Sequence, residues 1–239
     1  MSRLMKRQVI PFVAAFAWSG ASGAAEFFGP LPYLSAADSP FASLGANLSI
    51  EDFEDGLLNQ LGVSVSPGTT VLVAPDPLND SVDADDGVID GNGTAGRSLY
   101  SGGTLSRIDF RFDAALRGSL PSHVGIVWTD VGGVTSGTEG FGDVTFEAYD
   151  AADQLIGTIG PSILGNGTAA GTEGTGEDRF FGVIHAPGVA RISVVMGNSV
   201  DWEVDHLQFN AAPVPLPATV WLAGPALAGL IARRRRAPG

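Results

Sequence analysis

The sequence predicts an all-β protein, an antiparallel β-sandwich of the jelly-roll type, and three observations support this fold class. Short apolar segments recur along the middle of the chain, and in several of them apolar and polar residues alternate. The connections between the segments are rich in the 33 glycines and 15 prolines of the chain. No segment between residues 26 and 210 has a helical period longer than about two turns. Alternation over many short segments is typical of sheets with one buried face.

Two segments show the alternation most clearly. In RIDFRFD, the apolar residues Ile108, Phe110 and Phe112 share one face, and the charged residues share the other. In DVTFEAYD, Val144 and Phe146 likewise lie opposite polar neighbours. We expect the apolar faces to meet in one core between two sheets. The predicted strands cover residues 48–53, 61–65, 69–74, 105–112, 122–128, 143–149, 154–159, 179–184, 190–196 and 202–209.

Charge is unevenly distributed along the chain. All 26 acidic residues lie between Glu26 and Asp205, whereas seven of the 13 basic residues lie in the two ends. The middle therefore sets six arginines against 26 carboxylates, a formal charge of −20. Such a surface repels nucleic acid, which excludes it as a partner, and attracts cations. The alternative is that the acidic surface only keeps the protein soluble. Because the chain has no cysteine, an exported fold must depend on core burial or bound ions.

The N-terminus predicts a secretory signal peptide over residues 1–25. Three basic residues precede an apolar run of about ten residues, and small residues follow up to a cleavage position after Ala24 or the next alanine. The apolar run is too short to span a membrane. We expect an irregular segment over residues 26–46 and the sandwich domain over residues 47–210.

The C-terminus combines a proline motif, an apolar run and an arginine cluster. A helix over residues 218–232 covers about 22 Å, less than the roughly 30 Å of a hydrocarbon core. The positive-inside tendency keeps the Arg-rich tail, residues 233–239, in the cytoplasm while the domain lies outside. A Pro-rich linker that contains the motif, residues 211–217, joins this membrane helix to the sandwich.

The order of these parts resembles the C-terminal sorting signals read by exosortase-type transpeptidases. The VPLPA motif is similar to a variant of the PEP-CTERM signal, although Leu216 stands where the commoner form has Glu. The resemblance covers residues 214–239. It implies a Gram-negative bacterium, an inner-membrane intermediate, cleavage near Pro217, and delivery to the cell surface or extracellular matrix. The alternative is an ordinary single-pass anchor. The residues that carry the resemblance are Val214, Pro215, Leu216, Pro217, Ala218, Trp221, Arg233, Arg234, Arg235 and Arg236.

The first and last predicted strands, SIEDFEDG and DWEVDHLQF, resemble those of jelly-roll carbohydrate-binding modules. The resemblance implies that the two strands lie near each other and hold a structural calcium ion. Alternation places Asp205 on the face of Leu207 and Phe209, and a buried carboxylate needs a cation or several donors. The alternative is an ion pair with Arg179 or Arg191, or an exposed strand end. The expected calcium ligands are Asp52, Glu54 and Asp205.

A second acidic stretch, DPLNDSVDADDGVIDGNG, resembles the start of an EF-type calcium loop. Its glycine comes one residue early and no Glu closes it, so a solvated acidic turn is the alternative. The ligands in this stretch would be Asp83, Asp85 and Asp90.

The sequence contains no catalytic motif. The three histidines are scattered, and neither a His-Glu-x-x-His pair nor a G-x-S-x-G elbow is present. Trp128 and Trp202 are candidates for stacking on sugar rings, with a place in the core as the alternative. We therefore expect a non-enzymatic exported protein, adhesive or associated with extracellular polysaccharide. The alternatives are a secreted polysaccharide-active hydrolase on the same scaffold and a purely structural surface-layer component.

Overall fold

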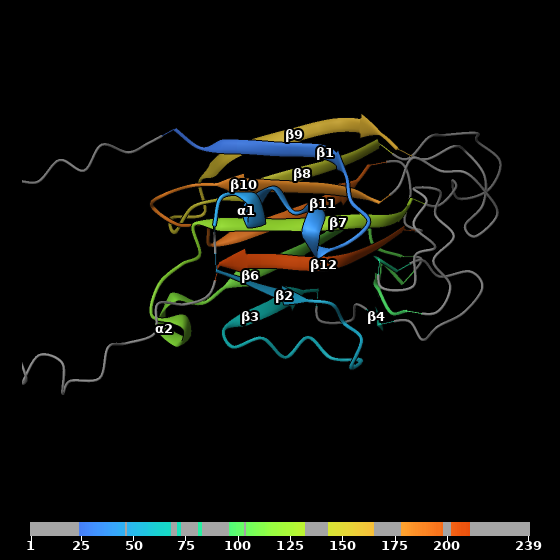
Figure 1. Cartoon of the computed structure of the whole chain (residues 1–239), viewed down its shortest axis with the longest axis horizontal. Coiled ribbons are helices and arrows are strands. Elements are labelled where there is room, and N and C mark those ends of the chain that lie inside the picture. The colour runs from blue at the N-terminus through green and yellow to red at the C-terminus, as the bar shows by residue number, and fades with distance from the viewer. Residues whose placement is uncertain are drawn as a thin grey trace, which may run out of the picture.

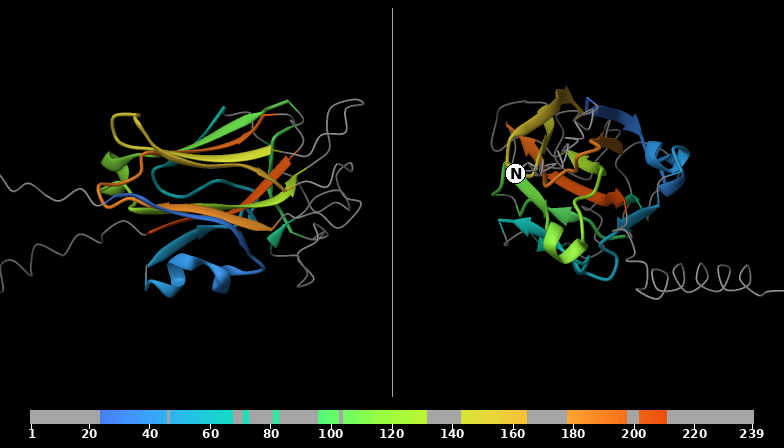
Figure 2. Two further views of the ribbon diagram at one scale, coloured as in Figure 1. Left: turned by 90° about the horizontal axis from the view of Figure 1, so that it is seen from above. Right: turned by 90° about the vertical axis from the view of Figure 1, so that its left-hand side faces the viewer.

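The computed structural model of the protein contains two antiparallel β-sheets stacked face to face, as the sequence predicts (Figure 1 and Figure 2). The sandwich is therefore confirmed. The structure describes residues 24–45, 47–67, 71–72, 81–82, 96–102, 104–131, 143–164, 178–197 and 202–210. The predicted signal peptide, apart from its last two residues, and the predicted C-terminal helix lie outside this part of the chain.

Sheet A has seven strands. Its order is β1 (Glu26–Pro32), β10 (Arg179–Ile184), β7 (His123–Val131), β12 (Trp202–Asn210), β5 (Leu99–Tyr100) and β4 (Val71–Leu72). The remaining strand, β2 (Leu48–Glu51), pairs with the second half of β12. The first and last strands that the sequence predicts are therefore hydrogen-bonded neighbours.

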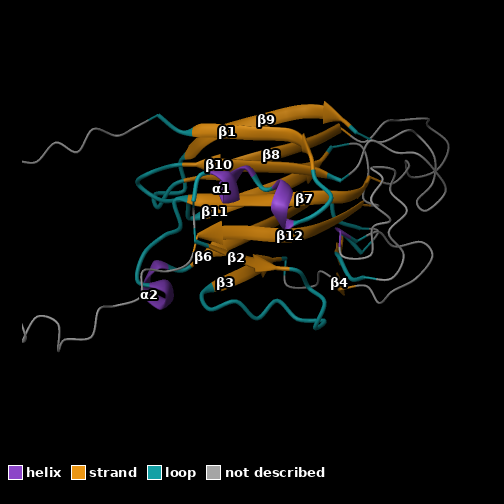
Figure 3. Cartoon of the chain, viewed as in Figure 1, coloured by secondary structure: helices purple, strands orange, loops and turns teal. Residues whose placement is uncertain are grey.

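Sheet B has five strands. Its order is β3 (Val63–Ser66), β6 (Arg107–Phe112), β11 (Arg191–Met196), β8 (Asp143–Tyr149) and β9 (Leu155–Ile163). Helices are short in the described residues, as Figure 3 shows: η1 (Ala36–Asp38), α1 (Pro40–Ser43) and α2 (Ala114–Arg117). In the described part of the chain, no helix has both the length and the apolar character needed to cross a membrane.

The inner faces of the two sheets form the main hydrophobic core. Ile108, Phe110 and Phe112 are at most 5% exposed, and Val144 and Phe146 are completely buried. These five residues belong to one cluster that also includes apolar residues of β7, β10, β11 and β12. The alternation in the sequence therefore identifies the inward face of β6 and β8 correctly.

A second apolar cluster covers the outer face of sheet A. Residues 33–45, which contain η1 and α1, lie across β7 and β10 (Figure 1 and Figure 2), and we call them the strap. Phe41 of the strap is completely buried, with its ring 5.2 Å from that of Phe180 and 5.8 Å from that of Phe28. The strap therefore buries the outer face of β7 and β10, so that these two strands of sheet A are covered on both sides.

Two strands differ from the expectation. All ten predicted strands are present with somewhat shifted ends, but β5 was not predicted, and β1 lies in the segment expected to be irregular. Glycine and two prolines in EFFGPLP oppose strand formation in the interior of a sheet. Here β1 is an edge strand, its pairing with β10 is interrupted between Phe28 and Leu31, and both features tolerate proline.

The described chain enters and leaves the sandwich at the same end. Glu26 at the start of β1 is in register with Ile184, which in turn is in register with His123. Asn210 at the end of β12 lies at this same end, beside α2 (Figure 1 and Figure 2). We call this end of the sandwich, which contains Glu26, His123 and Asn210, the exit end. The opposite end of the sandwich contains the last residue of β9, Ile163.

Candidate functional site

The position of the predicted calcium ligand Asp205 depends on an irregularity in β12. His206 has a φ of 44°, and the register with β7 shifts between Asp205 and Gln208, so β12 contains an extra residue at this point. The bulge moves Asp205 to the outer face of sheet A, where it is in register with Val127. The prediction that Asp205 shares a face with Leu207 and Phe209 is wrong for this reason. Apolar residues on both sides of the bulge pack in the main core: Trp202 and Val204, then Leu207 and Phe209.

Asp205 is nevertheless completely buried, as predicted. Its Oδ2 accepts hydrogen bonds from the Ser81 hydroxyl at 3.2 Å and the Val82 amide at 3.1 Å. Its Oδ1 accepts from the amide of His206 at 2.6 Å. Several donors of this kind are what a buried carboxylate requires. Neither Arg179 nor Arg191, the two alternative partners, forms one of these contacts; Arg191 binds Asp109 and Asp153 on the other sheet.

Glu54 and Asp205 meet at the hydroxyl group of Ser81. Glu54 Oε1 lies 3.5 Å from the Ser81 oxygen and also accepts from the amide of Arg97. Two of the three predicted calcium ligands, about 150 residues apart in the sequence, are thus brought to one place. The third, Asp52, is exposed and accepts from the amide of Glu54, which stabilises the turn after β2.

The second acidic stretch, residues 76–93, itself contributes Ser81 and Val82 to the contacts of Asp205. Asp83, Asp85 and Asp90 lie outside the described residues. However, Ser81 and Val82, which bind Asp205, directly precede Asp83. Within the described ranges, no group of three or more Asp, Glu or His side chains lies close enough to hold a metal ion.

Other buried carboxylates lie near Asp205 on β12 and β7. Glu203 is 3% exposed, and one of its oxygens accepts from the hydroxyl of Ser98. Asp130 is 7% exposed and is in register with Glu203, so the two side chains share a face. The outer face of sheet A therefore concentrates carboxyl groups on the strands β12 and β7, near Ser81 and Val82 of the second acidic stretch.

Sequence reasoning did not find the polar contacts that hold the strap on sheet A. The amide group of Gln208 donates to the Tyr33 hydroxyl at 2.7 Å, and this hydroxyl lies 2.9 Å from Nδ1 of His206. All three side chains are buried. The Tyr33 hydroxyl therefore accepts from Gln208 and forms a second hydrogen bond with the ring of His206. No local pattern indicates this contact, because Tyr33 lies more than 170 residues from its partners.

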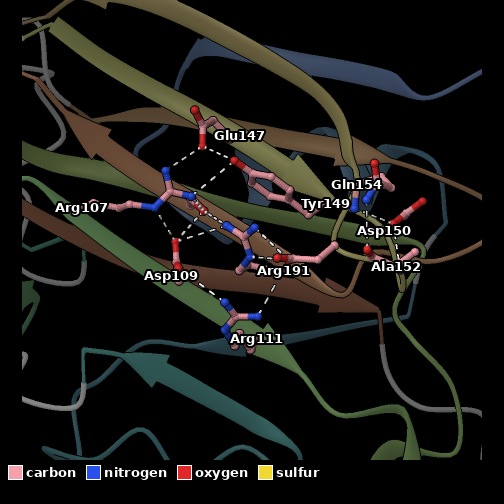
Figure 4. A network of polar contacts seen from close by, with 11 residues as sticks. Arg107, Asp109, Arg111, Glu147, Tyr149, Asp150, Ala152, Gln154 and Arg191 are labelled. Carbon is pink, nitrogen blue, oxygen red and sulfur yellow. Dashed lines mark hydrogen bonds and ion pairs between the residues drawn. The ribbon is translucent and has the colours of Figure 1, made fainter.

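The outer face of sheet B is exposed and carries a network of charged side chains (Figure 4). Arg191 donates to Asp153 at 2.8 and 3.0 Å and to Ser193 at 2.7 Å. Its guanidinium group lies 3.4 Å from the centre of the Tyr149 ring. Arg107 binds Asp109 at 2.9 Å and joins three strands of the sheet.

The pairing in this network shifts the pKa values of its members. The hydrogen bond from Arg191 lowers the pKa of Asp153 below its ordinary value. Burial alone would lower the pKa of Arg107, but hydrogen bonds to Tyr149 and Asp109 and the attraction of nearby carboxylates raise it. Each guanidinium group is therefore held in its charged form, and its donors are occupied by neighbours on the same sheet.

The two tryptophans proposed to bind sugar lie in the core. Trp128 and Trp202 are completely buried, and their ring centres are 4.9 Å apart. The indole nitrogen of Trp202 donates to the main-chain oxygen of Leu105 at 3.0 Å. A sugar-stacking platform needs an exposed ring face, so this placement contradicts the interpretation of these residues as ligand-binding residues. The alternative, a place in the core, is the one that the structure shows.

Comparison of the chain with known proteins finds no matching family model, no similar curated protein and no similar solved structure.

Proposed function

We propose that this chain is an exported, non-enzymatic β-sandwich protein that an exosortase-like system sorts to the surface or extracellular matrix of a Gram-negative bacterium. Its role there is adhesion or association with extracellular polysaccharide. The observation that carries the proposal is the order of parts at the C-terminus, where VPLPA precedes an apolar run and Arg233 to Arg236. The acidic composition of the body fits a position outside the cell, away from nucleic acid.

The β-sandwich fold is compatible with this assignment. The sandwich uses residues from Ala25, which packs against the main core, to Asn210 at the end of β12. The predicted sorting segment, residues 214–239, follows these residues in the sequence. The pairing of β2 with β12 also supports the finer proposal that the sandwich is of the jelly-roll type.

The sorting proposal is tested by changing Arg233 to Arg236 to Gln in a host that contains an exosortase. The wild-type chain is expected to appear at the surface as a species that lacks the tail. The variant is expected to remain unprocessed, because it lacks the arginine cluster that is part of the proposed sorting signal. The matched control changes Arg97 and Arg111 of the body to Gln. Identical processing of all three chains would contradict the proposal.

We also propose that a structural calcium ion binds beside Glu54 and Asp205, at the start of the acidic stretch. The observation that favours it is the convergence of these two carboxylates at Ser81. Calcium at 100 times its Kd would stabilise the domain by about 2.7 kcal/mol, and each kcal/mol raises the Tm of a domain of this size by about 2–4 °C. The measurement is the Tm of the purified chain in calcium and in a chelator.

Two variants localise the calcium effect. Glu54→Gln removes the charge of an exposed side chain and keeps an oxygen that can accept from the Arg97 amide, so it is expected to lower the calcium-dependent rise in Tm with little change of the Tm in chelator. Asp153→Asn, on the other sheet, is the control and is expected to retain the full rise. Equal Tm values of the wild-type chain in calcium and in chelator would remove the ion from the proposal.

A further inference from the structure

The last described residue, Asn210, is fixed at the exit end of the sandwich. Its side-chain oxygen accepts from the amides of Ser122 at 2.8 Å and His123 at 3.1 Å. Its main-chain oxygen accepts from the guanidinium group of Arg117 at 3.2 Å. The segment that follows Asn210 therefore starts from a point that is tied to β7 and α2.

Arg117 also places two leucines next to this point. Arg117 is 6% exposed, and its guanidinium group donates to the main-chain oxygen of Leu61 at 3.0 Å. It lies 4.5 Å from the centre of the Phe209 ring, directly before Asn210. A methyl group added to Gly62 would lie 3.1 Å from Cβ of Leu116, so the chain around Leu61 is in close contact with α2.

These leucines are among the most exposed large apolar residues of the described chain. Leu61 is 67% exposed and Leu116 is 59% exposed. Ala114 and Ala115, the first two residues of α2, are also exposed. The carboxylate of Asp113 accepts from two amides of α2 and caps the helix. We call Leu61, Ala114, Ala115 and Leu116 the exit-end apolar patch.

The length of the linker determines what this patch faces when the tail is held in a membrane. The apolar run begins at Ala218, and residues 211–217 extend over at most about 25 Å. The exit end thus lies within about 25 Å of the hydrocarbon boundary, a distance that the headgroup layer partly fills. Because Asn210 is fixed beside the patch, a domain held by its tail presents this end to the bilayer.

We propose that the exit-end apolar patch rests on the lipid surface while the tail is held in the membrane, so that the opposite end of the sandwich points away from the cell membrane. This inference rests on the proposed function. Exposed leucines gain free energy on entering the boundary between headgroups and acyl chains, and Leu61 and Leu116 are two exposed leucines close to one another at this end. The occupant of the patch is a lipid surface, and the apolar segment 218–232 is the competing occupant that the test distinguishes.

The absence of cysteine from the chain makes a site-specific test direct. Single cysteines are introduced as Leu116→Cys in the patch and as Ile163→Cys at the opposite end, where Ile163 is 65% exposed. Each full-length chain is labelled with an environment-sensitive fluorophore and reconstituted into phosphatidylcholine–phosphatidylglycerol vesicles that contain a headgroup-labelled nitroxide lipid. Quenching is expected to be severalfold stronger at position 116 than at position 163, and Leu61→Cys is expected to behave like Leu116→Cys.

Each outcome of this experiment decides between the alternatives. Equal, weak quenching at both positions in chains that remain bound to vesicles would overturn the lipid contact and leave the sorting proposal intact. A probe at position 116 that is shielded without vesicles and is not quenched by the nitroxide lipid would show that the tail covers the patch, which also overturns the lipid contact. Chains that do not bind vesicles at all would contradict the membrane-held tail itself.

Discussion

The outward-facing side chains of the two sheets are stabilised in different ways. On sheet A, the strap covers the face, and Phe41 and Phe180 make a second apolar cluster there. On sheet B, no described segment covers the outer face, and charged side chains of β6, β8 and β11 pair with one another along it (Figure 4). An outward-facing row of side chains can thus be stabilised either by burial or by pairing between strands.

The sequences of the strands explain which face is covered. The strand β10 reads RFFGVI, and its two consecutive phenylalanines point to opposite sides, Phe181 into the main core and Phe180 under the strap. The strand β6 reads RIDFRF and alternates strictly. A continuous apolar run therefore indicates a strand that is buried on both sides, whereas strict alternation indicates a strand with one exposed face.

The largest expected effect comes from breaking the cover of sheet A. Phe41→Ala removes a completely buried ring and is expected to reduce the free energy of unfolding by about 3–5 kcal/mol. The measurement is denaturant unfolding of the purified chain. Leu44→Ala in the same strap is the control, since Leu44 is 57% exposed, and it is expected to change stability by less than about 0.5 kcal/mol. Similar losses for both variants would show that the strap does not act through burial.

The corresponding change on sheet B is Arg191→Met. Arg191 is 5% exposed, and its loss breaks the charge-assisted hydrogen bonds that this buried guanidinium group donates to Asp153 and Ser193, so we expect a loss of about 1.5–3 kcal/mol. The control is Arg111→Met, because the Arg111 side chain is half exposed and its ion pairs are 3.7 and 3.9 Å long. That variant is expected to cost no more than about 1 kcal/mol. A larger loss for Arg111→Met would refute the role assigned to burial.

One tyrosine hydroxyl on each outer face provides a third comparison. Tyr33→Phe removes a buried hydroxyl between His206 and Gln208 and is expected to cost about 1–2 kcal/mol. Tyr149→Phe removes a hydroxyl that donates to the partly exposed Glu147, and it is expected to cost less than about 1 kcal/mol because water replaces the contact. Equal reductions of the free energy of unfolding in the two variants would argue that the two hydroxyl groups do not differ in their access to water.

The smallest expected effect is a difference in pH dependence between the faces. Burial lowers the pKa of His123, whose ring packs on Phe41, below 6.5. The unfolded chain therefore binds a proton at His123 more tightly than the folded chain does. For this reason His123 does not reduce the free energy of unfolding above pH 6.5, and it reduces it as the pH falls from 6.5 toward the folded pKa. Asp153 has a folded pKa below 3.8, so its contribution is present above pH 3.8 and is lost only below that value.

Unfolding measured between pH 3 and 8 checks this separation. His123→Gln is expected to flatten the upper part of the stability profile, and Asp153→Asn is expected to flatten the lower part. If His123→Gln leaves the change of the free energy of unfolding between pH 5 and 7 as it is in the wild type, burial of His123 under the strap does not cause this pH dependence.

The strands of the sandwich were predictable because their signals are local. Alternation in β6 and β8 and turn-rich connections between segments mark them directly in the sequence. The strand β1 was missed because its Gly and Pro residues are acceptable only at a sheet edge, and edge position is not a local property. The short strand β5 has too few residues to show any period.

The candidate site was predictable only in part. The sequence indicated that Asp205 is buried and lies near the first predicted strand, and the structure brings it together with Glu54. The bulge at His206 reverses the side of β12 on which Asp205 lies, and alternation alone cannot indicate an inserted residue. The network around Arg191 depends on the register of three strands, which no single segment of the sequence contains.

The position of β12 determines how the domain responds to force on its C-terminus. This strand is hydrogen-bonded to β7 on one side and to β2 and β5 on the other, and it ends at Asn210. Tension on the segment that follows would run along the strand, perpendicular to its ladder bonds. Several bonds would then have to break in shear at once, whereas a strand at the rim could be peeled away one bond at a time. Tension applied along β12 is therefore expected to meet more resistance than tension that peels off an edge strand such as β1.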